Sequence, residues 1–217
     1  YLDGIMAAQQ KIYGYDFLEE VLPDPIVKDF RKHFTDFYTA PEQSFCNDRS
    51  TLAQLYLDTE ISARERVDTM KLLGAQYHVD LYTGSDISDL PVKNRGLVKT
   101  LTEMPVVFHY SKINLNITAK SIRSGLPLRI FDILGCGGFC LTNYQPELSD
   151  YFTIGSDLEC YTDEKDLLDK VSYYLAHEDE RARIARNGFE TIKKYHNYPE
   201  RLLQMLSLAY GINEDTL

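Results

Sequence analysis

The stretch that decides the fold reads Ser111-Lys-Ile-Asn-Leu-Asn-Ile117 and, a few residues further on, Gly125-Leu-Pro-Leu-Arg-Ile-Phe-Asp-Ile-Leu-Gly-Cys-Gly-Gly-Phe-Cys-Leu-Thr-Asn143. In the first part apolar and polar residues alternate, which predicts a strand with its apolar side chains on one face. In the second part, residues 126–134 have the apolar spacing of a short helix, and residues 139–142 predict another strand. A strand, a helix and a strand in this order form a βαβ unit. The fold class that we expect is therefore α/β, with a Rossmann-like parallel sheet and flanking helices.

The glycines at the end of the predicted helix, Gly135, Gly137 and Gly138, are interpreted as structural. A glycine loop that binds phosphate follows a strand and precedes a helix, whereas these glycines follow a helix and precede a strand. We therefore expect them to end the helix and to form a tight turn into the next strand.

The chain as a whole divides at residue 76. Residues 1–75 show helical spacing and no strand signal, so we expect a helical N-terminal segment there, either a linker or the end of a missing N-terminal half. Residues 76–217 alternate between strand-like and helix-like segments and are expected to form one Rossmann-like domain with C-terminal helices. The further strands expected are 77–83, 97–101 and 158–161, and the further helices are 102–110, 163–176, 179–195 and 200–209. Ligands bind such sheets at the carboxyl ends of the strands, here the loops after residues 83, 117 and 142.

Charge and composition argue against some classes of partner. The chain has 23 Lys and Arg against 33 Asp and Glu, a net charge of −10, which disfavours nucleic acid or an anionic membrane over a broad surface. No apolar run approaches the ~20 residues of a membrane span. The four cysteines fit no metal-binding spacing and are expected to be free thiols, which favours a cytoplasmic setting. Because the sequence starts at Tyr1 and not at Met, we expect it to be a piece of a longer protein.

An acid-free interval lies between Glu103 and Asp132, and its four cations are Lys112, Lys120, Arg123 and Arg129. The turn over residues 124–127 precedes the predicted helix, so its N–H groups, the helix dipole and nearby arginines could bind a phosphate or diphosphate. The alternative is a mobile basic loop on the surface. For Asp132, the alternatives are a carboxylate that binds a ribose diol and one that only interacts favourably with the helix dipole.

The same stretch resembles the C-terminal domain of GT-B glycosyltransferases, in particular the branch related to spore-maturation-type glycosyltransferases. The resemblance extends over about residues 76–206, and the region before residue 76 resembles, more loosely, the helical region that precedes this domain in that branch. Later motifs that support it are Glu147-Leu148, Gly155, Tyr161, Leu167-Leu168, Val171-Ser-Tyr-Tyr-Leu175 and Arg183-Ile-Ala-Arg186-Asn-Gly.

The resemblance implies that the chain binds a nucleotide diphosphate sugar donor. Asp132 matches the second acidic residue of the family's paired-glutamate motif and is expected to hold the ribose. The first acidic position falls on Ser124, so the chain departs from the family pattern there, and contacts to the sugar are open. In this family two Rossmann-like halves face each other across a cleft, and Ser85 and Asp86 are weaker candidates for its rim. For Asn114 and Asn116, a structural role in the strand is an equal alternative to a role in binding. The donor-binding residues that we expect are Arg123, Ser124, Gly125, Leu126, Arg129, Asp132, Ser85 and Asn114.

A hexosyltransferase-like reaction follows from the same resemblance. Arg129, with Arg123 and the helix N-terminus, would stabilise the negative charge of the departing nucleoside diphosphate. No metal and no cofactor are expected. The acceptor (a glycan, a lipid or a protein) and any catalytic base would come with the N-terminal half of the parent chain, so the isolated chain is expected to be inactive or weakly active.

Other classes of function stay open from the sequence. One is a non-catalytic α/β interaction module whose helical front contacts a partner, and the other is a sugar-nucleotide-modifying enzyme such as an epimerase. In the glycosyltransferase interpretation, the resemblance suggests a role in cell envelope polysaccharide biosynthesis. It also allows peripheral membrane association of the parent protein.

Overall fold

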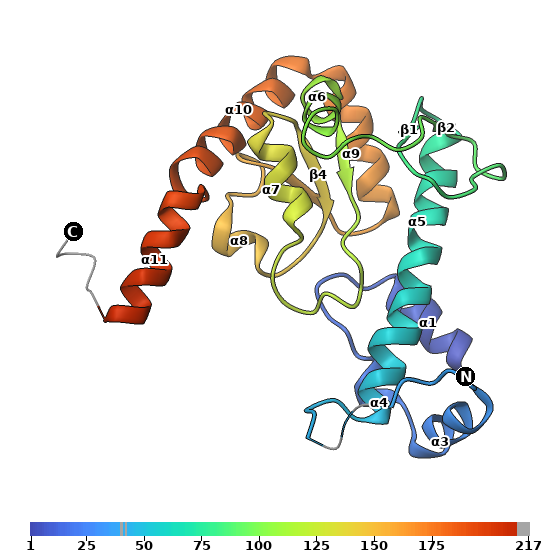
Figure 1. The fold of residues 1–217 in the computed structure, drawn as a ribbon. Coiled ribbons are helices and arrows are strands. Elements are labelled where there is room, and N and C mark those ends of the chain that lie inside the picture. The colour runs from blue at the N-terminus through green and yellow to red at the C-terminus, as the bar shows by residue number, and fades with distance from the viewer. Residues whose placement is uncertain (40, 42, 212–217) are drawn as a thin grey trace.

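The computed structural model describes residues 1–39, 41 and 43–211. It is an α/β structure in which a helical N-terminal segment lies below a small parallel sheet that is flanked by helices (Figure 1). The helices of the N-terminal segment are α1 (Leu2–Gln10), α2 (Leu18–Val21), α3 (Asp24–His33), α4 (Asp48–Thr51), the π-helix η1 (Leu52–Leu57) and α5 (Asp58–Gly74).

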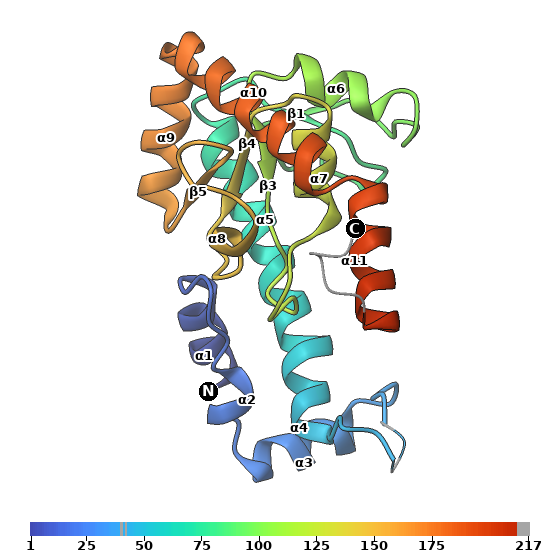
Figure 2. The same cartoon turned by 90° about the vertical axis from the view of Figure 1, so that its left-hand side faces the viewer.

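Local sequence explains how this segment folds. Pro23 precedes the first residue of α3, and the Asn47 side chain caps α4 in a reciprocal pair of hydrogen bonds with Ser50. Apolar residues from successive helices, among them Met6, Leu18, Leu52 and Ile61, form a core of their own. The helical segment is thus a packed unit, and α5 runs from it along the side of the domain that follows (Figures 1 and 2).

A separate pair of parallel strands, β1 (Asp80–Leu81) and β2 (Lys93–Asn94), follows α5. Of the strand expected over residues 77–83, only residues 80–81 form a strand. The strand expected over residues 97–101 is wrong, because Leu97 and Leu101 are exposed and belong to no strand. The strand that pairs with β1 is β2, which comes before residue 97 in the sequence, and the N–H of Lys93 donates to the carbonyl of Val79. Its residues are polar, so β2 shows no apolar pattern.

The main sheet contains the predicted βαβ unit. Its strands are β3 (Asn114–Asn116), β4 (Cys140–Asn143) and β5 (Glu159–Tyr161), all parallel and in the order β3-β4-β5. The helices around it are α6 (Met104–Tyr110), α7 (Leu128–Gly135), α8 (Leu148–Tyr151), α9 (Glu164–Ala176), α10 (Glu178–Tyr195) and α11 (Tyr198–Tyr210). The expected α/β fold class is confirmed, including the parallel strand pairing.

Helices cover both faces of this sheet. Cys140 faces a core formed with α6 and α7, while the next residue, Leu141, faces a core formed with α9 and α10. Figure 2 shows α9 on one side of the strands and α7 on the other. On β3, Asn114 and Asn116 are the buried residues, whereas Leu115 is only partly buried against the α9 core.

Two glycines shape the turn from α7 into β4. Gly137 has a φ of +72°, a left-handed conformation that costs glycine little. A Cβ on Gly138 would lie 2.6 Å from the Asn114 side chain and 2.6 Å from the carbonyl oxygen of Phe108. This geometry agrees with the interpretation of these glycines as structural.

Helix α11 projects away from the body of the molecule (Figure 1). None of its described residues is buried. In the part of the chain that the structure describes, no helix combines the length and the apolar character that crossing a membrane requires.

Candidate ligand site at the carboxyl edge of the sheet

The carboxyl ends of β3 and β4 carry a buried polar network. The amide of Asn116 donates to the hydroxyl oxygens of Thr118 (3.0 Å) and Thr142 (2.9 Å). Asn143 joins the two strands, because its oxygen accepts from the N–H of Thr118 and its amide donates to the carbonyl of Thr118. Each of these four side chains is buried. The network therefore fixes the point at which the loop from β3 to α7, residues 117–127, leaves the sheet.

The end of this loop forms the turn that the sequence marks as a phosphate site. Gly125 has a φ of +80° and open space around its Cα. Pro127 precedes α7, and within residues 1–39, 41 and 43–211 no side chain caps the N-terminus of that helix. The N–H of Ile130 donates to the carbonyl of Pro127. Among the described residues the N–H groups of Leu128 and Arg129 have no backbone acceptor, so these two groups and the helix dipole are available to an anion. Asp132 lies further along α7 and is exposed.

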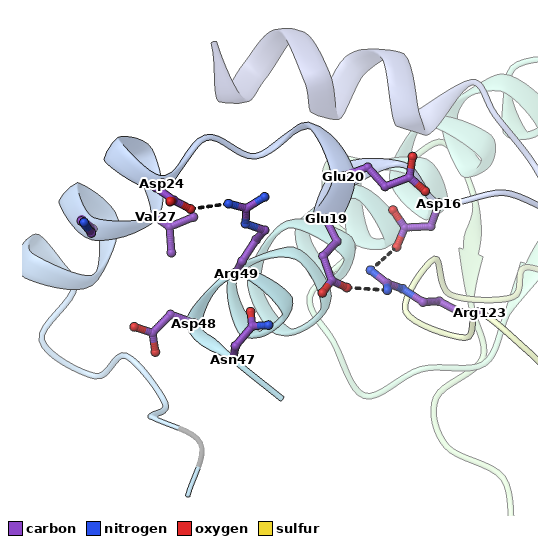
Figure 3. Close-up of a pocket in the computed structure, with 10 residues that line it drawn as sticks. Asp16, Glu19, Glu20, Asp24, Val27, Asn47, Asp48, Arg49 and Arg123 are labelled. Carbon is purple, nitrogen blue, oxygen red and sulfur yellow. Dashed lines mark hydrogen bonds and ion pairs between the residues drawn. The ribbon is translucent and has the colours of Figure 1, made fainter. Parts of the chain in front are cut away.

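Arg123, a predicted diphosphate ligand, is engaged by the helical segment. Its guanidinium lies 2.8 Å from a carboxylate oxygen of Asp16 and 2.8 Å from one of Glu19 (Figure 3). The Asp16 side chain is only 7% exposed, whereas Glu19 is about a third exposed. Arg123 can therefore reach a diphosphate only if it leaves these two carboxylates.

Arg129, the other predicted diphosphate ligand, lies against α6 and not against the helical segment. Its guanidinium donates to the sulfur of Met104 at 2.8 Å and lies 5.4 Å from the centre of the Phe108 ring. Neither contact neutralises its charge, and the residue is exposed. Among the described residues, Arg129 in the first turn of α7 therefore has no carboxylate partner.

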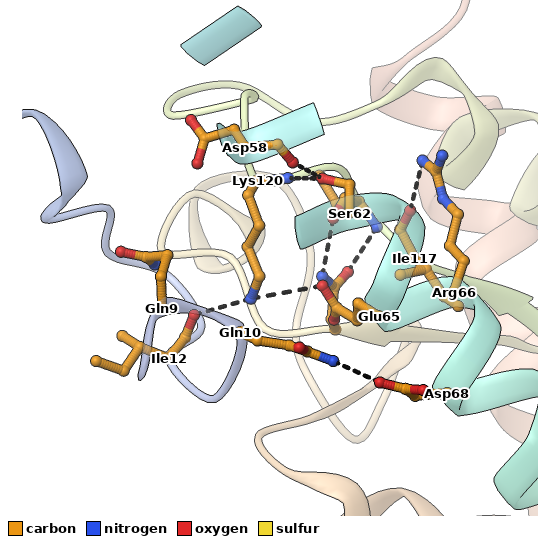
Figure 4. Close-up of polar contacts among 12 residues, drawn as sticks. Gln9, Gln10, Ile12, Asp58, Ser62, Glu65, Arg66, Asp68, Ile117 and Lys120 are labelled. Carbon is orange, nitrogen blue, oxygen red and sulfur yellow. Dashed lines mark hydrogen bonds and ion pairs between the residues drawn. The ribbon is translucent and has the colours of Figure 1, made fainter. Parts of the chain in front are cut away.

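Lys120 is buried under the helical segment. Its ammonium lies 3.6 Å from the Glu65 carboxylate, donates to the carbonyl of Ile12 at 2.9 Å and lies 4.0 Å from the centre of the Tyr13 ring. Its backbone N–H donates to the hydroxyl of Ser62 (Figure 4). Burial lowers the pKa of Lys120 and raises that of Glu65, while their mutual attraction opposes both shifts.

The remaining predicted residues lie elsewhere. Asn114 is at the amino end of β3, where its buried amide donates to the carbonyls of Phe108 and Phe139. Ser85 and Asp86 line a hollow of about 350 Å³ that is formed by residues of the β1–β2 loop and of β2. The N–H of Ser88 donates to Asp86 and lowers the pKa of its carboxyl. The predicted residues from 123 to 132 lie on one continuous loop and helix. Ser85 and Asp86 do not lie with them but in the β1–β2 region.

Sequence reasoning missed the acidic residues that meet the basic loop. Asp16, Asp58 and Glu65 are buried carboxylates of the helical segment, and Asp58 and Glu65 share a face of α5 with Ser62. The sequence offered only a weak signal for them. Asp58, Ser62 and Glu65 are polar residues that recur at helical spacing on the face of α5 that is buried. A hollow of about 780 Å³ opens beside Arg123, and its walls come mainly from the helical segment (Figure 3).

The fold defines an α/β protein of the parallel-sheet class in which the helix α7 begins after the loop at the carboxyl edge of the sheet. The sequence model of the Glycosyl transferase-like family matches residues 55–207, from within η1 to within α11. The chain belongs to this family, which identifies a glycosyltransferase domain. No curated protein matches the chain.

Proposed function

We propose that this chain is the donor-binding half of a GT-B glycosyltransferase of the spore-maturation-type branch, and that it holds a nucleotide diphosphate sugar at the N-terminus of α7. One observation carries the proposal: in a member of a glycosyltransferase-like family, an uncapped helix N-terminus follows a glycine turn at the carboxyl edge of a parallel sheet. Such a helix end binds a phosphate group through its N–H groups and its dipole.

The proposed roles follow from position. The diphosphate lies on the turn at Ser124–Leu126 and the first turn of α7, next to Arg129, and Asp132 on the same helix accepts hydrogen bonds from the ribose hydroxyls. Arg123 joins the diphosphate only after exchanging its carboxylate partners. Ser85 and Asn114 would contact the donor only after a rearrangement of their surroundings.

The reaction is the transfer of a glycosyl group. The bond from the anomeric carbon to the diphosphate oxygen breaks, and the acceptor oxygen forms a new bond to that carbon. The acceptor hydroxyl gives its proton to a base, which we place, with the acceptor site, on the other half of the parent protein. As the diphosphate departs, its negative charge grows, and Arg129 and the α7 dipole stabilise that charge in the transition state. This arrangement requires no metal ion.

The test is a calorimetric titration of the chain with the diphosphates of uridine, guanosine, adenosine and thymidine. We expect one of them to bind, and Arg129→Ala to weaken that binding by about 10- to 100-fold, since a hydrogen bond between ions contributes about 1.5–3 kcal/mol. Asp132→Ala should weaken nucleoside diphosphate binding but leave pyrophosphate binding unchanged. Lys112→Ala, the matched control, removes an exposed charge at the amino end of β3 and should have no effect.

Three results would contradict the proposal or a part of it. If no nucleoside diphosphate binds, a non-catalytic interaction module becomes the better explanation. If Arg129→Ala and Lys112→Ala weaken binding equally, only the overall charge matters and the site is elsewhere. Transfer of sugar by residues 1–217 alone would refute the placement of the acceptor site on another half.

A further inference from the structure

We infer that Glu65 and Asp16 are positioning residues: carboxylates of the helical segment that hold the β3–α7 loop in the shape in which it presents the N-terminus of α7 to the donor. The inference rests on the proposed function for its link to the donor. Its structural part, the fixing of the loop by buried ion pairs, rests on the contacts described next.

The buried Lys120 is the first anchor of the loop. Its side chain is 7% exposed, and that of Glu65 is 4% exposed. The ammonium contacts Glu65 and the carbonyl of Ile12 (Figure 4). It also lies over the ring of Tyr13, which belongs to the helical segment as well. An ammonium that is buried and already paired does not extend to a ligand. Removing its partner would leave an uncompensated buried charge, which costs far more than the loss of a surface pair.

Arg123 is the second anchor, and Ile117 provides a third contact. Both carboxylates at Arg123, from Asp16 and Glu19, belong to the helical segment (Figure 3). Where the loop leaves β3, the carbonyl of Ile117 lies 3.5 Å from the guanidinium of Arg66, which belongs to α5 of the helical segment. The helical segment therefore contacts the first part of the loop at three points, Ile117, Lys120 and Arg123. The acid-free interval of the loop and the carboxylates of the segment are complementary in charge.

These anchors lie close to the proposed donor site. Only residues 124–127 separate Arg123 from α7, and four residues span at most about 14 Å when fully extended. The conformation of the glycine turn is thus limited by where Arg123 is held. The family match also begins before α5, so it includes Glu65 with the domain. The helical segment is in this respect a component of the site and not a detachable linker.

The experiment measures hydrogen exchange and nucleoside diphosphate binding of the whole chain and of Glu65→Gln, Asp16→Asn and the charge-conserving Asp16→Glu. We expect the first two variants to raise backbone exchange over residues 118–127 while residues 140–161 stay protected, and to weaken binding by about fivefold to tenfold. Asp16→Glu should restore most of both properties. Glu60→Gln is the matched control, because Glu60 is an exposed carboxylate on the same helix, paired with Arg64.

The outcomes separate the parts of the inference. Unchanged exchange over residues 118–127 in both Glu65→Gln and Asp16→Asn would overturn it, whether or not a nucleotide binds. A loosened loop with unchanged affinity would overturn the link to the donor. If the wild-type chain binds no nucleoside diphosphate, the proposed function fails, and the exchange data alone decide whether the segment fixes the loop. If Glu65→Gln does not fold, Asp16→Asn tests the anchor at Arg123 by the same two measurements.

Discussion

Asp58 should make the stability of this protein fall as the pH rises from acid toward neutrality. Its side chain is fully buried on α5, and within the described part of the chain neither carboxylate oxygen accepts a hydrogen bond. Its neighbour is the carboxylate of Asp16, which can form a hydrogen bond with Asp58 only if one of the two carries a proton. Burial, first, and then Asp16 raise the pKa of Asp58 to about 7, against the opposing pull of Arg123 and Lys120.

The sign and size follow from proton linkage. The ordinary pKa of this carboxyl is 3.8, so between pH 4 and pH 7 the folded chain binds more protons at Asp58 than the unfolded chain does. The stabilisation is therefore complete below pH 4, is lost as the pH rises, and is gone above pH 7. At about 1.4 kcal/mol per pH unit, the loss between pH 5 and pH 7 is about 2–3 kcal/mol. Asp58→Asn cannot ionise and should be spared this loss.

The assay is urea unfolding at pH 5, 6, 7 and 8, followed by far-ultraviolet circular dichroism because the chain contains no tryptophan. The quantity compared is the free energy of unfolding of Asp58→Asn minus that of the wild type. Glu65, whose pKa burial also raises, titrates in both proteins and cancels in this difference. Asp68→Asn, an exposed position on the same helix, is the control and should show no such dependence.

We expect the difference to favour Asp58→Asn increasingly from pH 5 to pH 7 and to become constant at pH 8. A difference that stays constant over the whole range would show that Asp58 is not protonated at pH 5 in the folded chain. A difference that moves in the other direction would show that Arg123 and Lys120 outweigh burial, and the reasoning would be wrong.

Other predictions concern packing around α7. Gly138→Ala should destabilise the fold by about 1–3 kcal/mol in thermal or urea unfolding, because the new Cβ meets the carbonyl of Phe108. In the control Gly135→Ala, the nearest neighbour of the new Cβ is 3.7 Å away, so this variant should be neutral or slightly stabilising. Equal effects of the two substitutions would refute the argument. Leu134→Ala should cost about 2–5 kcal/mol, since Leu134 is fully buried, whereas Leu128→Ala, at a side chain 78% exposed, should stay within about 0.5 kcal/mol; a small loss at Leu134 would mean that the core relaxes around the cavity.

The sequence predicted those elements in which one local pattern suffices. The unit β3–α7–β4 combines alternation, helical spacing and glycines within a short stretch, and α9 and α10 are long and amphipathic, so their positions were found to within a few residues. The strands β1 and β2 were missed in part because each pairs over two residues and β2 has no apolar pattern. The apolar residues 97–101, which suggested a strand, are not buried by the sheet.

The candidate site shows a similar division. Local charge located the basic loop and the helix start, but the partners of its cations are far away in sequence: Arg123 is 104 residues from Glu19 and Lys120 is 108 residues from Ile12. Single-sequence patterns carry no information on which of many acidic residues will pair over such separations. The sequence therefore could not show that Lys120 and Arg123 are already paired, whereas Arg129 has no carboxylate partner in the part of the chain that the structure describes.

The role of Arg123, as anchor or as diphosphate ligand, can be decided by counting protons. Arg123 lowers the pKa of Asp58 and pairs with Asp16, so its departure toward a ligand would leave two buried carboxylates facing each other with less positive charge nearby. Near pH 7, where Asp58 is already partly protonated, these carboxylates would then take up a further fraction of a proton, because like charges in a buried pair cannot both ionise without cost. If Arg123 stays in place, as the anchoring role requires, this part of the protein takes up none. Titrations of a nucleoside diphosphate in buffers of different ionisation enthalpy measure the uptake, and Asp58→Asn identifies its source: uptake that disappears in Asp58→Asn would establish Arg123 as a ligand and refute its role as a fixed anchor.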